Sequence, residues 1–291
     1  MGKPTLILCS DIHLREDQPL CRLDDFITVQ FEKLCWLQML QEKYDCPVVC
    51  AGDLFHFWKP SPSLLTKTIR ALPNNFWTVY GQHDLPQHNL ELQVKSGVYT
   101  LATANKLQIL NECHWGQEPT KGSLVLPGSD KQILVMHRLT WKTEKPWPTC
   151  MASNARTLLK KYPQFDLIVT GDNHQTFVET LGERILVNPG SFTRQKADQK
   201  EHKPCVFLWF AKTNSVEQVF VPIKEDVVST EHIEAQKERD GRIDAFITRL
   251  TNDWEVDVNF QENLKRFFIE NPTRQSVYNT IYASLEKGGV L

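Results

Sequence analysis

The feature that most constrains the fold is a series of short apolar runs, rich in β-branched residues, that ends at about residue 222. Runs this short, and apolar at nearly every position, are typical of strands that are covered on both faces. They lie at residues 5–10, 46–52, 75–81, 132–137, 166–171, 184–190, 204–210 and 216–222. We therefore expect these runs to form buried strands.

Stretches with helical spacing lie between several of the runs. Residues 24–43 place apolar side chains near a 3.6-residue period, and Asp24 or Asp25 is the expected N-cap. Residues 61–72 and 151–162 show further helical patterns. Strand–helix alternation in the first half and closely spaced strands in the second half together predict an α/β fold, with two mixed sheets packed together and flanked by helices.

The pattern changes after Pro222, because residues 229–287 contain no strand-like run. They contain three charged, amphipathic helical stretches at roughly 229–250, 258–270 and 273–287. We predict a main domain at residues 1–222 and a small helical appendage at residues 223–291.

Composition and charge limit the classes of function. The formal net charge is −2, so any affinity for nucleic acid has to come from a local patch or from metal ions. The eight cysteines form no CxxC pair, which is typical of reduced thiols in a reducing cytosol. No apolar run approaches the ~18 residues of a membrane span, and the N-terminal run is too short for a signal peptide. We expect a cytoplasmic protein with no membrane partner.

Five of the predicted strands end in acidic, imidazole or amide side chains. Any one of these motifs alone is more typical of a polar turn. Their occurrence at successive strand ends indicates a shared site, because ligands bind at the carboxyl ends of strands in open α/β sheets. The residues are Asp11, His13, Asp53, His56, Gln82, His83, Asp84, His137, Asp172 and His174.

The types of side chain indicate the class of ligand. Carboxylates, imidazoles and an amide without a thiolate favour Mn²⁺, Fe²⁺, Mg²⁺ or Zn²⁺ over a structural cysteine–zinc site. The candidate ligands are too many for one ion and suit two ions about 3.5–4 Å apart that share a carboxylate. Such a pair binds a phosphoryl group and supports in-line displacement.

These motifs resemble those of the calcineurin-like metallophosphoesterases, whose order is D-x-H, G-D, G-N-H-[DE], H and G-H-x-H. The chain has "DIH" at 11–13, "GD" at 52–53, "GQHD" at 81–84, His137 and "GDNH" at 171–174. The resemblance covers about residues 4–222 and implies a four-layer β-sandwich. The stretch "GDLFHFWKPSP" is similar to SbcD-type DNA nucleases, and "GQHDLPQHN" and "NPGSFTRQKADQKEHKP" are similar to phage-encoded members of that branch.

The resemblance implies a role for each residue of the site. The implied ligands of the first metal are Asp11, His13, Asp53 and His174, with Asp53 bridging to the second. The implied remaining ligands of the second metal are Gln82, His137 and Asp172. His83 would act on the phosphate or the leaving oxygen, oriented by Asp84, and His56 would help to position the DNA strand.

Two positions depart from the family pattern, and both fall on the second metal. Gln82 stands where the family has Asn, and Asp172 stands where it has His. Gln is longer by one methylene, whereas Asp reaches less far than His, so the two changes could compensate and make the site harder and more like a Mn²⁺ or Mg²⁺ site. The competing interpretation is a weakened or empty second site.

Candidates for binding substrate are Lys59, Arg138 and Arg194, which follow strand-end motifs. Arg194 begins the run "RQKADQKEHK", whose acidic residues make a solvated loop the simpler interpretation. Phe55, Phe57 and Trp58 flank His56, and they could stack on a base or belong to the core.

The leading hypothesis is a two-metal, Mn²⁺-favouring phosphodiesterase that hydrolyses DNA as an SbcD-like exo- or endonuclease in repair or recombination. The resemblance implies an SMC-like ATPase of the SbcC type as a partner, with residues 223–291 as a cap or docking segment, and a homodimer is a further expectation. One alternative is a phosphodiesterase or phosphatase for a cyclic nucleotide or nucleotide. Another is a non-catalytic scaffold with a degenerate metal site.

Overall fold

The computed structural model describes residues 2–110, 113–119, 124–126, 130–231, 233, 239, 241–245 and 260–287. The chain divides into two compact units, Met1–Ser229 and Thr230–Leu291. A functional boundary at residue 222 stays a prediction.

One of the two sheets of the larger unit is a six-stranded mixed sheet, in the order β13-β12-β1-β2-β3-β4. Strands β1 to β4 run parallel to one another, and β12 pairs antiparallel with both β1 and β13. The strands are β1 Leu6–Cys9, β2 Val48–Cys50, β3 Phe76–Thr78, β4 Gln108–Ile109, β12 Cys205–Phe210 and β13 Ser215–Phe220.

A five-stranded mixed sheet follows, in the order β10-β11-β9-β6-β5. Its central strands β6, β9 and β11 are parallel, while β5 and β10 pair antiparallel at the edges. The strands are β5 Leu124–Val125, β6 Gln132–Met136, β9 Leu167–Thr170, β10 Phe177–Leu181 and β11 Arg184–Asn188. A two-stranded ribbon joins β7 Thr140–Trp141 to β8 Ser153–Asn154.

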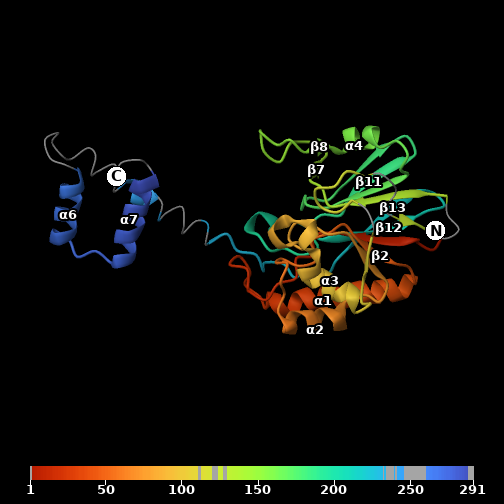
Figure 1. Ribbon diagram of the computed structural model, residues 1–291, viewed down its shortest axis with the longest axis horizontal. Helices are drawn as coiled ribbons and strands as arrows, with labels where there is room; N and C mark the ends of the chain where they lie inside the picture. The colour runs from red at the N-terminus through yellow and green to blue at the C-terminus, as the bar shows by residue number, and fades with distance from the viewer. Residues whose placement is uncertain are drawn as a thin grey trace. The chain divides into compact units, whose positions relative to one another are not determined.

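Helices cover the outer faces of both sheets and complete four layers. Helices α1 and α2 lie on one side of the larger unit and α4 on the other (Figure 1). The helices of this unit are α1 Phe26–Tyr44, α2 Pro62–Ala71, α3 Gly97–Thr103 and α4 Ala155–Lys161, with short 3₁₀ turns η1 Pro86–His88, η2 Leu90–Lys95 and η3 Ala197–Gln199. The predicted α/β fold of two mixed sheets flanked by helices is confirmed.

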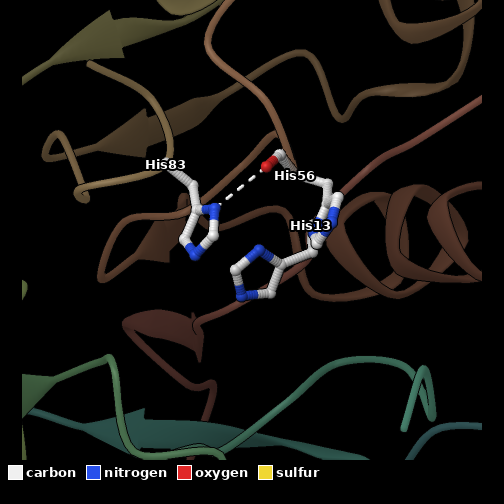
Figure 2. A group of neighbouring side chains, drawn as sticks. All are labelled: His13, His56 and His83. Atoms are coloured by element: carbon white, nitrogen blue, oxygen red, sulfur yellow. Dashed lines mark hydrogen bonds between the residues drawn. The ribbon is translucent and has the colours of Figure 1, made fainter. Parts of the chain in front are cut away.

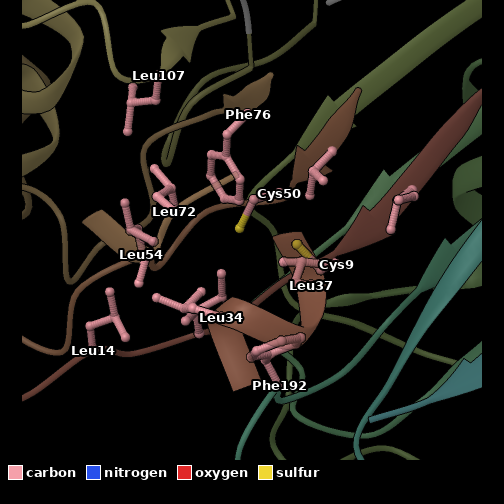
Figure 3. Close-up of a cluster of buried hydrophobic side chains, with 14 of the residues drawn as sticks. Cys9, Leu14, Leu34, Leu37, Cys50, Leu54, Leu72, Phe76, Leu107 and Phe192 are labelled. Atoms are coloured by element: carbon pink, nitrogen blue, oxygen red, sulfur yellow. The ribbon is translucent and has the colours of Figure 1, made fainter. Parts of the chain in front are cut away.

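Burial on both faces explains why most of the strand runs are apolar throughout. The run at residues 216–222 is the exception, because β13 has only exposed and partly buried positions, so the prediction of a buried strand there is wrong. In β1, Leu6 and Leu8 face the core between the two sheets, whereas Ile7 and Cys9 face the core beneath the helices. Side chains alternate between the faces of a strand, so a strand with two covered faces has no polar position. Figure 3 shows the helix-side core, where Leu34 and Leu37 of α1 lie near Cys9.

Local capping fixes where the first two helices begin. The side chain of Asp25 accepts a hydrogen bond from the backbone N–H of Thr28, so Asp25 is the N-cap of α1. Ser61 caps α2 in the same way, and Pro62 stands at the first helical position, where a missing N–H costs nothing.

The eight predicted strand runs and the helices at 24–43, 61–72 and 151–162 all appear, with shorter boundaries. The sequence missed the two-residue strands β4, β5, β7 and β8, because two residues carry no detectable period. It also missed β10, whose half-exposed residues mix polar and apolar types, and the two-turn helix α3.

The smaller unit contains the predicted C-terminal helices at 258–270 and 273–287. They correspond to α6 Phe260–Glu270 and α7 Gln275–Lys287, and their shared core consists of Leu264, Ile281 and Leu285. Of the predicted stretch 229–250 the structure describes only a part, and Phe246, Ile247 and Leu250 lie outside the described residues.

A membrane span needs a helix that is both long and apolar, and no helix in the described ranges meets that condition.

The inter-sheet core predicts the effect of truncating β1. Leu8 is fully buried, so Leu8→Ala should lower the free energy of unfolding by about 3 kcal/mol, from lost burial and a residual cavity. Chemical denaturation measures the change. Leu20, which is 87% exposed, provides the matched control, and Leu20→Ala should change stability by less than about 0.5 kcal/mol. Equal effects at both positions would contradict the placement of β1 between the sheets.

Candidate metal and catalytic site

The predicted site residues lie in the loops that follow parallel strands of both sheets. Asp11 and Asp53 follow β1 and β2 of one sheet, and His137 and His174 follow β6 and β9 of the other. The backbone N–H of Asp172 donates to Asp11 Oδ1 at 3.1 Å, which joins the carboxyl ends of the two sheets directly. The loops therefore meet at one place.

Two carboxylates form the centre of this cluster. Asp53 Oδ2 lies 3.3 Å from His137 Nε2 and 3.6 Å from His13 Nε2. Asp11 Oδ1 lies 3.9 Å from both His13 Nε2 and His174 Nε2. Two sets of three potential ligands result, each with ligand atoms within 4.8 Å of one another: Asp11, His13 and His174, and Asp11, Asp53 and His137.

The backbone holds several of these residues in a conformation that L-amino acids rarely adopt. Asp11, His13, Asp53 and Asp172 have φ of 49°, 50°, 54° and 74°. The left-handed region costs a non-glycine residue about 1–2 kcal/mol. Strain of this kind is concentrated at functional sites, where the surrounding structure enforces it.

Gly81 allows the close approach of two of these loops. A Cβ at Gly81 would lie 2.0 Å from Asp53 Oδ1 and 2.6 Å from the backbone nitrogen of Asp53. No other residue fits without displacing the Asp53 carboxylate. The glycine of "GQHD" is therefore required by the geometry of Asp53.

Several buried polar atoms at this cluster have no hydrogen-bond partner among the described residues. Burying such an atom costs about 1–3 kcal/mol, so their concentration at one point needs a cause. The atoms are Asp11 Oδ2, His13 Nδ1, Asp53 Oδ2, Gln82 Oε1 and His137 Nε2. Carboxylate oxygen, amide oxygen and imidazole nitrogen form a donor set that fits divalent cations.

The orientation of His137 suits it to bind a metal. Its Nδ1 lies 2.6 Å from the carbonyl oxygen of Ala51, which can only accept a hydrogen bond, so Nδ1 carries the proton. In the neutral ring the lone pair is then on Nε2, which faces Asp53. Histidine ligands commonly have their other nitrogen fixed by such a bond.

The electrostatics of the cluster favour positive charge. Burial raises the pKa of Asp11 to about 7, and the neighbouring Asp53 adds to the shift. Burial acts against charge on His137, but the carboxylate of Asp53 outweighs it and raises the pKa of His137 to about 10. Burial likewise opposes ionisation of Asp53, yet His137 and His13 hold its pKa well below the usual range. Two buried carboxylates thus stabilise any cation placed between them.

The two departures from the family pattern are in direct contact. Gln82 Nε2 donates to Asp172 Oδ1 at 2.6 Å, and Gln82 Oε1 is buried with no partner in the described part of the chain. The longer amide and the shorter carboxylate therefore adjoin the same space. That they compensate as metal ligands stays a prediction.

His83 and His56 lie beside the cluster as a stacked pair, with ring centroids 5.5 Å apart (Figure 2). His83 Nδ1 donates to the backbone carbonyl of His56 at 2.9 Å, and the backbone N–H of His83 donates to Asp53 Oδ1 at 2.9 Å. The ring is fixed at one nitrogen, and its Nε2 is available for chemistry.

A pocket of about 100 Å³ opens beside these rings. Its lining consists of His13, Arg15, His56, His83, His174, Ser191, Gln195, Lys196 and Gln199. The sequence had not singled out Arg15, Ser191, Gln195 or Gln199. Arg15 lies two residues after His13, as His13 lies two after Asp11, and the other three residues come after β11. Their positions after strand ends were therefore the only feature of the sequence that could have pointed to them.

Comparison with known proteins identifies the family. Residues 5–209 match the model of the calcineurin-like phosphoesterase superfamily domain. The chain belongs to this superfamily. This phosphoesterase domain accounts for the mixed-sheet fold, supports hydrolysis of phosphoesters as the class of reaction, and supports divalent metals as cofactors.

Solved structures that match the chain have low sequence identity to it. An archaeal phosphodiesterase is 12% identical with a TM-score of 0.42, and the match covers 74% of this chain and 98% of that protein. Vps29 from Entamoeba histolytica in complex with Zn²⁺ is 14% identical with a TM-score of 0.37, covering 75% and 99%. A Thermus thermophilus protein is 12% identical with a TM-score of 0.44, covering 76% and 100%. No curated protein matches the chain.

Asp84 has a different role in the phosphoesterase domain from the one the sequence suggested. Its buried carboxylate accepts hydrogen bonds from the backbone N–H groups of Leu54, Phe55 and Gly81 at 3.3, 3.1 and 3.1 Å. The prediction that Asp84 orients the His83 ring is wrong, because the carbonyl of His56 does so. Asp84 instead fixes the loops after β2 and β3 to each other.

Arg194 also differs from its prediction as a substrate-binding residue. It is 5% exposed, and its guanidinium donates to the carbonyl oxygens of Lys200, at 3.0 Å, and Lys224. Arg194 therefore stabilises the loop after β11 and is not placed to contact substrate. Burial lowers the pKa of the neighbouring Lys33 to about 7, and the charges of Arg22 and Arg194 add to that shift.

The other candidates for binding substrate lie at the surface. Lys59 is exposed, and Arg138 forms an ion pair of 2.9 Å with Glu118. Of the aromatic residues near His56, Phe55 is fully buried in the core, whereas Phe57 is 59% exposed. A substrate role for Lys59, Arg138 and Phe57 stays a prediction.

The three backbone hydrogen bonds of Asp84 generate a test of stability. Asp84→Ala leaves buried N–H groups unpaired and should lower the free energy of unfolding by about 3 kcal/mol or more. Denaturant titration measures the effect, and Asp198→Ala at an exposed position should change stability by less than about 0.5 kcal/mol. An Asp84→Ala variant as stable as the wild type would contradict the structural role.

Proposed function

We propose that this phosphoesterase domain is a two-metal phosphodiesterase that hydrolyses DNA. The observation that supports it best is the convergence of partnerless buried carboxylate, amide and imidazole atoms next to His83. Such an arrangement is costly in a scaffold and useful in a metal-dependent hydrolase.

The residues present fit two divalent cations. Asp11, His13, Asp53 and His174 would hold the first ion, with Asp53 shared. Gln82, His137 and Asp172 would complete the second, for which the oxygen ligands favour Mn²⁺. When bound, such ions would supply positive charge for the phosphoryl oxygens and would lower the pKa of a water for in-line attack.

His83 acts on the leaving oxygen. The carbonyl of His56 fixes the proton on Nδ1, so a protonated ring can donate only from Nε2. A proton delivered there stabilises the departing alkoxide as general acid catalysis requires. His56 packs against the His83 ring and keeps it in this orientation.

The shape and charge of the pocket favour a large anionic substrate. A volume of about 100 Å³ is below the ~300–1,000 Å³ of pockets that enclose small ligands, so the substrate lies across the site. Lys196 supplies positive charge at its lining, and the exposed Phe57 could stack on an unpaired base. These features favour DNA over an enclosed cyclic nucleotide.

The proposal extends to the biological setting that the resemblance implies. We propose an SbcD-like exo- or endonuclease of DNA repair or recombination, phage-encoded and acting in the cytoplasm, whose C-terminal helices dock an SbcC-type ATPase or a second copy of the chain. A non-catalytic scaffold is the second candidate, favoured by the two departures at Gln82 and Asp172.

A substrate panel tests the proposal. The protein is incubated with Mn²⁺ and single-stranded DNA, blunt duplex DNA, a cyclic dinucleotide or bis-p-nitrophenyl phosphate. We expect hydrolysis of DNA and of the model diester. Hydrolysis of the cyclic dinucleotide alone would establish the small-molecule alternative, and no hydrolysis of any substrate would establish the scaffold.

Removal of the proposed acid should separate chemistry from metal binding. His83→Ala should lower turnover by about 10²-fold or more while the metal content stays unchanged. The exposed His88 serves as control, and His88→Asn, which suits its φ of 55°, should leave turnover intact. Full activity of His83→Ala would remove His83 from the mechanism.

Metal counting tests the second site. If Gln82 and Asp172 compensate, both the wild type and Asp172→His should bind two Mn²⁺ ions, as measured by calorimetry and elemental analysis. One tightly bound ion in the wild type and two in Asp172→His would show that the departures weaken the site.

A further inference from the structure

Three imidazoles lie together next to the carboxylates of the site. His13, His56 and His83 each offer a ring nitrogen, and these atoms lie within 4.8 Å of one another. Ring centroids are 4.9 Å apart for His13 and His83, 5.7 Å for His13 and His56, and 5.5 Å for His56 and His83. Figure 2 shows the three rings converging from separate loops.

The hydrogen bonds of these rings leave nitrogen lone pairs unused. His83 Nδ1 is the donor to the His56 carbonyl, so the lone pair of the neutral His83 ring is on Nε2. His13 Nε2 faces His174 at 3.3 Å and Asp53 at 3.6 Å, on the carboxylate side. His13 Nδ1 is buried without a hydrogen-bond partner among the described residues. A neutral imidazole has one lone pair, so His13 offers Nδ1 to this group of rings only when Nε2 carries the proton.

We propose that His13, His56 and His83 form a third divalent-cation site, that this site selects Zn²⁺, and that filling it stops hydrolysis. The proposed binding of Zn²⁺ depends only on the geometry of the three histidine rings. The proposed inhibition depends in addition on the proposed function as a hydrolase.

The ligand set favours zinc over the ion of the carboxylate cluster. Three imidazoles without an oxygen ligand suit Zn²⁺, whereas Mn²⁺ prefers carboxylate-rich sites. Nitrogens bound to Zn²⁺ at 2.0–2.1 Å in tetrahedral geometry are roughly 3.4 Å apart. The present separations of up to 4.8 Å therefore close by about 1.4 Å or less, which side-chain rotation alone can supply.

The surroundings allow a charged ion and leave room for its fourth ligand. Arg15, which also lines the pocket, is paired with Asp17 by two hydrogen bonds, so its charge is largely balanced. Three protein ligands leave one position of Zn²⁺ open. The adjoining pocket of about 100 Å³ can hold a water or a phosphate oxygen there.

Occupation of this site would remove the groups proposed for catalysis. A bound Zn²⁺ would take the lone pair of His83 Nε2, and that nitrogen could then carry no proton for the leaving oxygen. It would also engage His13, which the first catalytic ion needs. The protein would thus be activated by Mn²⁺ and inhibited by added Zn²⁺.

Zinc binding can be measured without substrate. Asp11 belongs to both carboxylate-containing ligand sets, and Asn tolerates its φ of 49°, so Asp11→Asn disables those sets with little backbone strain. In this background, calorimetry should still detect one Zn²⁺ per chain. A further His56→Asn should weaken that binding by at least about 10-fold, whereas a further His88→Asn should not.

A second measurement uses the Asp11→Asn chain without Mn²⁺. Added Co²⁺ should give the visible absorption of a tetrahedral nitrogen-ligated ion, and His56→Asn should abolish that absorption while His88→Asn preserves it. Equal Zn²⁺ binding by the His56→Asn and His88→Asn variants, or no Zn²⁺ binding beyond the carboxylate sets, would overturn the proposal. Absence of Mn²⁺-dependent hydrolysis with intact Zn²⁺ binding would refute the proposed function and leave the zinc site standing.

Discussion

The rest of the structure depends on two carboxylates, Asp11 and Asp53, held within a buried space between the ends of two sheets. Parallel pairing of β1 with β2, and of β6 with β9, sends the loops of each sheet toward the same edge. Packing of the sheets then places these edges against each other. Buried carboxylates are stable only when a positive charge lies next to them. The fold therefore favours the binding of cations at this place.

The site is rigid because its own backbone is constrained. Four of its residues occupy the left-handed region, and Gly81 provides the space that the Asp53 carboxylate needs. Asp84 fastens the two loops that carry Asp53 and His83. A preorganised set of ligands binds metal without the free-energy cost of ordering flexible loops.

Neighbouring histidines divide the site into two chemical environments. On one side, His137 and His174 share their space with carboxylates, which suits hard cations. On the other, His13, His56 and His83 face one another without an oxygen ligand, which suits zinc. His13 belongs to both environments, so ions bound on the two sides would affect each other. The same cluster could therefore serve activation and inhibition by different metals.

The sequence by itself determined the strand order along the chain, the main helices and the strand-end positions of the site, because apolar periodicity and polar residues at strand ends are local signals. Only the tertiary structure decided which charged residues face the site. The sequence suggested functional roles for Asp84 and Arg194, but both side chains form hydrogen bonds with the backbone. Arg15 and Gln199 line the pocket, although no sequence motif had indicated that they would. The reason is physical: hydrogen-bond partners come from segments distant in sequence, and the direction of a side chain depends on how those segments pack.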